Sequence, residues 1–382
     1  MKKLFNFLVF TILLASTSCS NKELSKNNYL VPMDVPNEKI ENFSELFSEI
    51  EYTLFPSEAS VIRVDKAQKF ENFFVFGDYD ISNSISIIDS NFTTSKNILA
   101  IGGGPGEYAK ILDFTINKTV GTVDVLTLNK LISYDFNGKF IKEIKLPGSV
   151  GKIVHVKEDD YVIYREKSLH SNFPGPDEQS ILWVWNTSNN TTSRIPSGSE
   201  NIKFPFFMER NNLNFQNNNV IFSTNFLDTI YVFSDNLELK EKRYFSGDRK
   251  YMPINLITKH NGVFPSEIES NYYFHLPNIL ENRNLFITTL RIEGYFNSYI
   301  YSKTNNKGII FSNPTNDIDG GFPFIPIILL DEKYIYSAVE SNYLIEHLEQ
   351  NNINSESQFY LFASKLNINS PLVLTKYKLK SF

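Results

Sequence analysis

The sequence predicts an all-β protein folded as a six-bladed β-propeller with four-stranded blades. Apolar runs are short and are interrupted by Asn, Asp, Gly and Ser, as expected between strands. The 382 residues include 33 Phe and 20 Tyr, and aromatic side chains favour the half-buried surfaces of sheets. A turn pattern recurs every 46 to 51 residues, and such a period with four strands per unit is typical of propellers. A pair of β-sandwiches is the alternative, but no linker-like stretch divides the chain.

The repeat lies in the turn that follows an apolar strand end. Its first four copies are IDSNF, YDFNGKF, WNTSNNT and FSDNL, which align at Asp89, Asp135, Asn186 and Ser234. A fifth copy is Tyr301–Lys307, and a sixth, less regular copy lies near Leu366–Ser370. Asn, Asp and Gly tolerate the positive φ of tight hairpins. We therefore expect each copy to join two strands of one blade, with six blades between Val61 and Phe382.

The N-terminus predicts export. Residues 1–18 combine Lys2 and Lys3 with an apolar run and a small-residue end, which is the pattern of a signal peptide. Cys19 is the single cysteine, and its place at the cleavage point resembles a bacterial lipobox, although Ser16 departs from that motif. We expect a lipid on Cys19, a tether over residues 19–37 and the propeller over residues 38–382. The alternative is an incidental cysteine. The lipid would place the protein in the cell envelope, on the periplasmic face or on the cell surface.

Two stretches predict helices, and one predicts a loop. Residues 40–50 have apolar positions at helical spacing, for one or two turns. Residues 341–352, SNYLIEHLEQNN, predict a short amphipathic helix inserted in the last blade. Packing on the rim is favoured for this helix over binding a partner. Residues 249–271 predict a loop or lid, and Glu49–Leu54 is expected to close the ring by pairing with Leu372–Leu379.

Composition and motifs exclude several functions. The net charge of -6 argues against a nucleic-acid partner. One cysteine allows no internal disulfide and no cysteine metal cluster. None of the five histidines has HxxxH spacing, so each is expected to be a surface or packed residue, and no G-x-S-x-G motif occurs. No cofactor or metal is expected from these motifs, but an acid/base pair across the central channel stays open.

Two glycine-rich loops are candidate ligand contacts. Gly102–Tyr108 lacks the Lys-Ser/Thr of a phosphate loop and leads into a strand, so a crossover between blades is favoured, with Glu107 and Tyr108 capping backbone groups. Contact of Glu107 and Tyr108 with a ligand is the second interpretation. Asp317 and Asp319 lie in a D-x-D-G-G run that could offer oxygens to Ca²⁺, although the complete calcium loop is absent. Turn stabilisation is favoured there.

Three stretches carry a family resemblance. GGGPGEY at Gly102–Tyr108, ILDFTIN at Ile111–Asn117 and YDFNGKFIKEIKLP at Tyr134–Pro147 resemble the six-bladed, NHL-like β-propeller lipoproteins of Bacteroidetes. SPLVLTKYKLK at Ser370–Lys380 is similar to the final strand of that family. The resemblance implies a fold and an envelope location but no settled activity.

The leading functional expectation is a lipid-anchored binding or scaffold module for a glycan, a peptide or an envelope protein. The alternative is a metal-dependent hydrolase or lyase of the NHL-like kind, with its site in the central channel. Three or more convergent Asp, Glu, His or Asn side chains on the axis would favour the enzyme. An apolar or aromatic channel with a hydrophobic rim would favour binding. The oligomeric state is left open.

Overall fold

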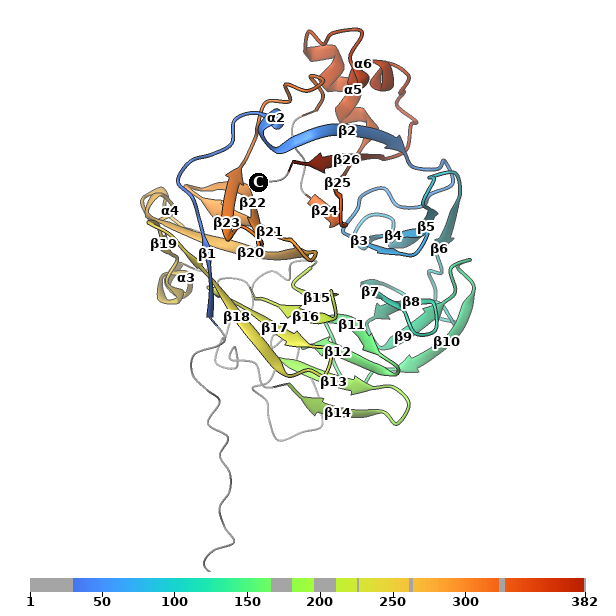
Figure 1. Ribbon diagram of the computed structural model, residues 1–382. Helices are drawn as coiled ribbons and strands as arrows, with labels where there is room; N and C mark the ends of the chain where they lie inside the picture. Colours follow the sequence, from blue (N-terminus) through green and yellow to red (C-terminus); the bar gives the residue numbers. More distant parts are fainter. Residues whose placement is uncertain are drawn as a thin grey trace, which may run out of the picture.

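The computed structural model describes residues 30–165, 181–195, 211–224, 227–260, 264–322 and 327–380. The expected signal peptide, Cys19 and His170 lie outside these described residues. The chain forms six small sheets arranged in a ring (Figure 1). The strands of a sheet follow in sequence order from the axis outward, except that the outermost strands of two sheets come from the N-terminal segment. This confirms the predicted six-bladed β-propeller.

The first three blades are simple four-stranded meanders. Blade 1 consists of β3 (Lys66–Phe70), β4 (Phe73–Asp78), β5 (Ser84–Asp89) and β6 (Ser95–Ile98). Blade 2 consists of β7 (Ile111–Asn117), β8 (Thr122–Thr127), β9 (Lys130–Tyr134) and β10 (Phe140–Lys145). Blade 3 consists of β11 (Lys152–Lys157), β12 (Asp160–Tyr164), β13 (Leu182–Asn186) and β14 (Thr191–Arg194). Every pairing within these blades is antiparallel.

The other three blades take extra strands. Blade 4 consists of β15 (Leu213–Gln216), β16 (Asn219–Phe222), β17 (Thr229–Ser234), β18 (Leu239–Ser246) and β1 (Leu30–Asp34). Blade 5 consists of β20 (Tyr272–Glu281), β21 (Leu285–Ile292), β22 (Tyr295–Ser302) and β23 (Lys307–Phe311), with β19 (Lys250–Tyr251) beside β20. Blade 6 consists of β24 (Ile327–Leu330), β25 (Tyr334–Val339), β26 (Val373–Leu379) and β2 (Phe47–Leu54).

The N-terminal segment closes the ring. Strand β2 pairs antiparallel with β26, with Ile50 opposite Tyr377 and Leu54 opposite Val373. The predicted pairing of Glu49–Leu54 with the last strand is therefore confirmed. Residues 30–34, within the stretch expected to be a tether, form β1, a parallel strand on the outer edge of β18.

The core is a ring of apolar clusters, each between two neighbouring blades. Phe114 of blade 2, for example, packs with Val75 and Ile85 of blade 1. Five equivalent clusters fill the other interfaces, including the interface between blades 6 and 1, where Phe74 and Tyr336 have ring centroids 5.7 Å apart. A blade that is apolar on both faces buries them only by stacking on its neighbours. The high aromatic content therefore serves these interfaces.

Buried polar contacts also join the blades. Lys66 of β3 and Asp113 of β7 form an ion pair of 2.8 Å in which both side chains are fully buried. The second carboxylate oxygen of Asp113 accepts the backbone N–H of Ile153 in β11 at 3.0 Å. One carboxylate therefore links three consecutive innermost strands. A buried charge is costly unless it is paired and hydrogen-bonded, and these contacts meet that requirement for Asp113.

The five clear copies of the turn repeat are confirmed as hairpins between the third and fourth strands. Phe92, Gly138 and Leu237 occupy matching positions with φ of 57°, 76° and 64°. Each donates its N–H to the carbonyl three residues earlier, on Asp89, Asp135 and Ser234. The sixth assignment was wrong, because residues 366–370 form a turn before β26. Blade 6 has no turn of this kind, since its fourth strand comes from the N-terminus.

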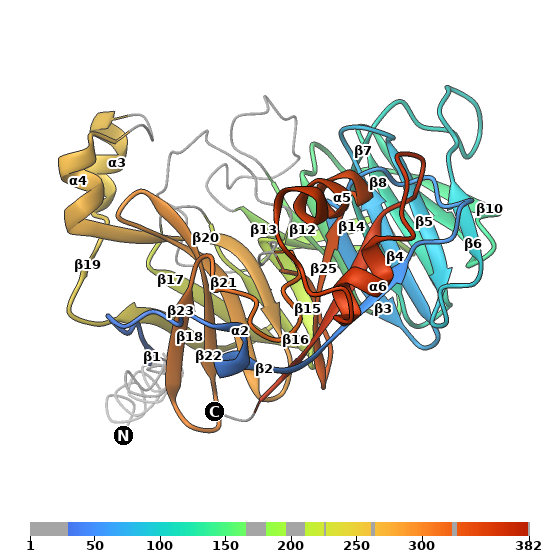
Figure 2. The ribbon, with the colours of Figure 1, turned by 90° about the horizontal axis from the view of Figure 1, so that it is seen from above.

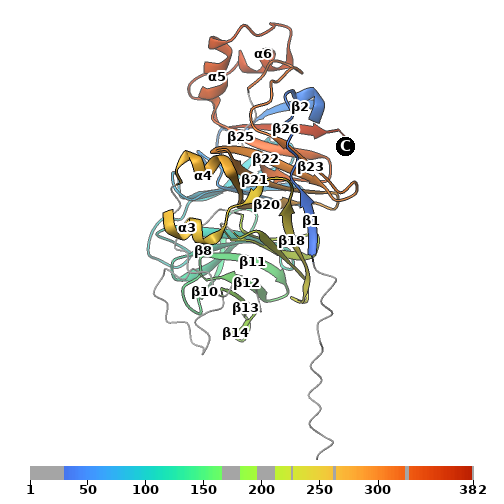
Figure 3. The same ribbon diagram turned by 90° about the vertical axis from the view of Figure 1, so that its left-hand side faces the viewer.

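The molecule has two different faces. We define the turn face as the face at which each innermost strand turns into the second strand, and the crossover face as the opposite one. Helices α3 (Ile254–His260), α4 (Ser266–Asn271) and α5 (Ser341–Gln350) lie on the crossover face (Figures 2 and 3). The predicted last-blade helix is α5, and α6 (Gln358–Ala363) follows it. Residues 249–271 hold β19, α3 and α4, which corrects the predicted loop. Residues 40–50 hold a single helical turn, α2 (Phe43–Leu46), before β2.

Candidate ligand-binding site at the channel mouth

A hollow of about 700 Å³ opens at the turn face, at the end of the central channel. Every blade contributes to it, because each innermost strand ends there. Its lining includes Gln68 and Lys69 of blade 1, Thr115 and Lys118 of blade 2, His155 of blade 3, Asn214–Asn217 of blade 4, Leu280–Asn282 of blade 5 and Leu329–Tyr334 of blade 6. We call this hollow the channel mouth.

Amide side chains give the channel mouth free hydrogen-bond donors. Gln68 accepts the N–H of Ile116 at 3.0 Å, and Gln216 accepts the N–H of Glu281 at 2.5 Å. Both glutamines thereby bind the next blade through their carbonyl oxygens. Within the described part of the chain, their NH₂ groups have no hydrogen-bond partner. An amide nitrogen carries two donors, so these groups can meet hydroxyl or carbonyl oxygens of a ligand.

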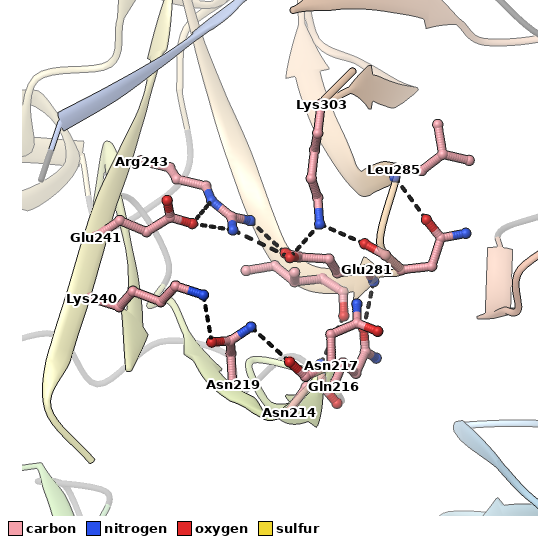
Figure 4. Close-up of polar contacts among 12 residues, drawn as sticks. Asn214, Gln216, Asn217, Asn219, Lys240, Glu241, Arg243, Glu281, Leu285 and Lys303 are labelled. Atoms are coloured by element: carbon pink, nitrogen blue, oxygen red, sulfur yellow. Dashed lines mark hydrogen bonds and ion pairs between the residues drawn. The ribbon is translucent and has the colours of Figure 1, made fainter. Parts of the chain in front are cut away.

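An ionic cluster of largely buried side chains includes Glu281, a residue of the channel-mouth lining (Figure 4). Glu281 accepts from Arg243 of blade 4 and from Lys303 of its own blade, with an Nζ–O distance of 2.5 Å to Lys303. Arg243 also pairs with Glu241. Burial alone would lower the pKa of Arg243, but the carboxylates of Glu281 and Glu241 raise it above its ordinary value. The pair of Arg243 and Glu281 fixes blade 4 against blade 5.

A second ionic contact lies across the mouth, between blades 6 and 1. Asp331 accepts from Lys69 at 2.8 Å and from the Tyr336 hydroxyl at 2.6 Å. Its other oxygen accepts the N–H groups of Lys333 and Tyr334, both at 2.9 Å. Burial alone would raise the pKa of Asp331, but these hydrogen bonds lower it. Asp331 therefore stabilises the turn as a carboxylate and is not a candidate general acid.

His155 is the histidine of the channel mouth. It is 3% exposed, packs edge-on against Tyr161 and lies 2.9 Å from the carbonyl of Glu158 through Nε2. Burial lowers its pKa. The described residues contain no group of three or more His, Cys, Asp or Glu side chains placed to hold a metal ion.

Glu107 and Tyr108 lie away from the channel mouth, in the crossover between blades 1 and 2. Glu107 accepts the N–H of Gly104 at 2.8 Å, and the buried Tyr108 hydroxyl contacts the carbonyls of Asn83 and Ile98. Burial raises the pKa of Tyr108 to about 12. Gly106 has a φ of 70°, and a Cβ there would lie 2.6 Å from the Phe140 ring. The residues cap backbone groups, as the favoured interpretation predicts.

Asp317 and Asp319 lie in the crossover between blades 5 and 6 and face different partners. Asp317 accepts the N–H and hydroxyl of Ser44 at 2.8 and 2.5 Å, which ties α2 to this crossover. Asp319 accepts from Asn316 at 2.7 Å and from the N–H of Gly321 at 3.0 Å. The structure does not bring the two carboxylates together, nor does it bring either to Glu107. Their contact with a ligand stays a prediction.

A catalytic-looking contact lies between blades 4 and 5. Ser223 Oγ is 2.6 Å from His275 Nε2, and Tyr251 Oη is 2.7 Å from Nδ1. Tyr251 donates its own proton to the carbonyl of Leu227, so it accepts from Nδ1–H, and Nε2 accepts from Ser223. The arrangement resembles a nucleophile and its base. However, Ser223 and His275 are both 0% exposed, so a substrate has no access and the contact supports packing.

The fold is a six-bladed β-propeller, and the channel mouth is a hollow to which all six blades contribute. The chain belongs to the family described as a domain of unknown function, DUF4934, whose model matches residues 30–375. The comparison with curated proteins found no match. None of the described helices is long and apolar enough to cross a membrane.

Two solved structures share the fold. One is a protein of Bacteroides fragilis NCTC 9343, provisionally described as exported, with a TM-score of 0.75 and 14% identity over 92% of this chain and 100% of the other. The second is a member of the DUF4221 family from Bacteroides vulgatus ATCC 8482, with a TM-score of 0.51 and 12% identity over 90% of this chain and 100% of the other.

Proposed function

We propose that this protein is an extracytoplasmic, lipid-anchored binding module that holds a polar ligand at the channel mouth. The observation that carries the proposal is a hollow to which all six blades contribute. Ligand sites in proteins are concave and largely preformed, with a few convergent polar groups. The free amides of Gln68 and Gln216 supply such groups, and the ionic contacts around Glu281 and Asp331 hold the walls in place.

The proposal also includes the location of the protein and the NHL-like type of its blades. The similar Bacteroides fragilis protein is provisionally described as exported. The apolar start of the sequence, followed by Cys19, supports export with a lipid on that cysteine. The glycine-rich crossover and the YDFNGKF hairpin support NHL-like blades. A glycan, a peptide or an envelope protein would each be within reach of a protein anchored in this way.

The experiment is to block the channel mouth. Lys118 is exposed in the turn between β7 and β8, and no partner of its side chain is found among the described residues. The variant Lys118→Trp places a large ring over the hollow. The matched control is Lys139→Trp, on an exposed turn of the same blade but at the outer edge. The protein is screened by thermal denaturation against maltohexaose, tetragalacturonate and hexapeptides of alanine, lysine and glutamate.

A ligand at the channel mouth should raise the melting temperature of the wild type and of Lys139→Trp. The same ligand should bind Lys118→Trp at least about tenfold more weakly than it binds the wild type, a loss of about 1.4 kcal/mol. Equal binding to all three proteins would contradict the proposed site. The predicted alternative, a metal-dependent hydrolase or lyase, has no observation in its favour among the described residues, and we do not propose it.

A further inference from the structure

A second hollow extends from the channel mouth along the turn face, between blades 5 and 6. Its volume is about 760 Å³, and its walls are the two turns of blade 5, the first turn of blade 6 and the end of β26. It shares Asn282 and the stretch Leu330–Tyr334 with the channel mouth. We call it the radial groove. Because both hollows share these walls, a linear ligand could occupy them together.

Positive charge dominates the free side chains of the radial groove. Lys333 is exposed and has no ion-pair or hydrogen-bond partner for its amine within the described ranges. Lys380 donates only to the backbone carbonyl of Ser44, and Lys378 meets Glu49 at 3.4 Å with both side chains about half exposed. Such an exposed pair contributes little. Of the acids on the walls, Asp331 is already bound to Lys69, which leaves Glu332 to oppose three lysines.

The uncharged lining offers groups that can both donate and accept. The side chains of Asn284 and Thr304 and the hydroxyl of Tyr334 have no partner among the residues described. Asn282, in contrast, is held in place at both ends of its amide, because it donates to the carbonyl of Asp331 at 2.8 Å and accepts the N–H groups of Asn284 and Leu285. Asn282 is therefore held rigidly in the wall of the groove. The amide and hydroxyl groups beside it match a ligand that is rich in hydroxyls.

We propose that the channel mouth and the radial groove together bind a linear oligosaccharide that carries carboxylates. Lys333, which has no partner among the described residues, and the weakly paired Lys378 and Lys380 recognise the acidic groups. The amide and hydroxyl side chains recognise the sugar hydroxyls. Tyr334 is half-buried and belongs to the walls of both hollows, so its ring is placed at the junction where a sugar can lie against it. This inference rests on the proposed binding function and names its ligand class.

The test is a calorimetric titration of the full mature chain with four probes. Tetragalacturonate and a hyaluronan hexasaccharide carry hydroxyls and carboxylates, maltohexaose carries only hydroxyls, and tetraglutamate carries only carboxylates on a peptide. We expect binding of at least one acidic oligosaccharide, at least about tenfold tighter than maltohexaose or tetraglutamate. Raising the salt concentration should weaken it, because charges exposed to solvent are screened.

Variants separate this inference from the general proposal. Lys333→Gln should weaken the acidic sugar about fivefold, since one charge-assisted hydrogen bond is lost. Tyr334→Ala should weaken it further, and Lys139→Gln, outside both hollows, should change nothing. Binding of maltohexaose or tetraglutamate as tight as that of the acidic sugars would overturn the inference, as would no binding of either acidic sugar. A ligand lost in Lys118→Trp but unaffected by Lys333→Gln would leave the channel-mouth proposal standing and refute the acidic oligosaccharide.

Discussion

His275 is fully buried and uses both ring nitrogens, one toward Tyr251 and one toward Ser223. Burial lowers its pKa to about 3 from the ordinary 6.5. In the unfolded chain the same ring takes up a proton near pH 6.5. The unfolded state therefore binds more protons than the folded state between these two values. Stability must fall as the pH drops below about 6.5, and it is fully present above that pH.

This residue leads to a pH prediction. Between pH 6.5 and 5, His275 should reduce the free energy of unfolding by about 1 kcal/mol per pH unit. The variant His275→Gln cannot titrate, so its stability should fall less steeply over this range. Denaturant unfolding at pH 6.5, 6 and 5 measures both slopes. Burial also lowers the pKa of His155, so His155 contributes a slope of the same sign, and His155→Gln is the companion variant.

Parallel pH profiles of the wild type and His275→Gln would contradict this account. They would mean that water reaches the ring in the folded protein. The sequence predicts a packed or surface histidine at this position, and burial agrees with that prediction. The contact with Ser223 could not be predicted, because the two residues belong to different blades and lie 52 positions apart.

At the scale of the elements, β2 is a part of the architecture that could be predicted from the sequence. The strand is amphipathic, with Ile50 buried among Phe311, Ile335 and Tyr377, and Glu49 exposed beside it. The closure was predicted because propellers commonly complete their last blade with a terminal strand. The same closure explains why the sixth turn was misplaced, since a strand supplied from the N-terminus needs no hairpin.

Removing the buried side chain of this strand should weaken the closure. Ile50→Ala is expected to lower the free energy of unfolding by about 2–4 kcal/mol, the usual cost of such a truncation in a core. Glu49→Ala, on the exposed side of the same strand, should change it by less than about 0.5 kcal/mol. Urea unfolding at pH 7 compares the two variants. Similar midpoints for both would argue that β2 contributes little to stability.

Other elements could not be predicted for a physical reason. Residues 249–271 contain two prolines and short apolar runs, and α3 and α4 are short helices whose stability depends on packing rather than on local propensity.

The residues of the candidate site were also not predicted from the sequence. The lining residues come from all six blades, with one to a few residues from each. The site therefore has no local sequence motif from which it could be predicted. Gln68 and Gln216 looked like ordinary strand residues until the ring placed them around one axis.

At the scale of the molecule, anchoring is the property that the sequence predicts most directly. The variant Cys19→Ser should move the protein from the membrane fraction to the soluble fraction, because acyl chains contribute about 0.8 kcal/mol per buried CH₂. Ser20→Ala is the matched control and should stay with the membrane. Fractionation of cells that make each variant measures the result. Membrane association that survives Cys19→Ser would show that another feature holds the protein there.

The pairing of β2 with β26 also constrains when the protein can fold. It joins residues as far apart as Glu49 and Lys378, 329 positions along the chain. During synthesis β2 emerges early and has no partner until nearly the whole chain has followed it. Contacts this distant are slow to form, and an unpaired strand edge is prone to aggregate in the meantime. The ring of blades therefore stays open until the last residues of the chain have been made.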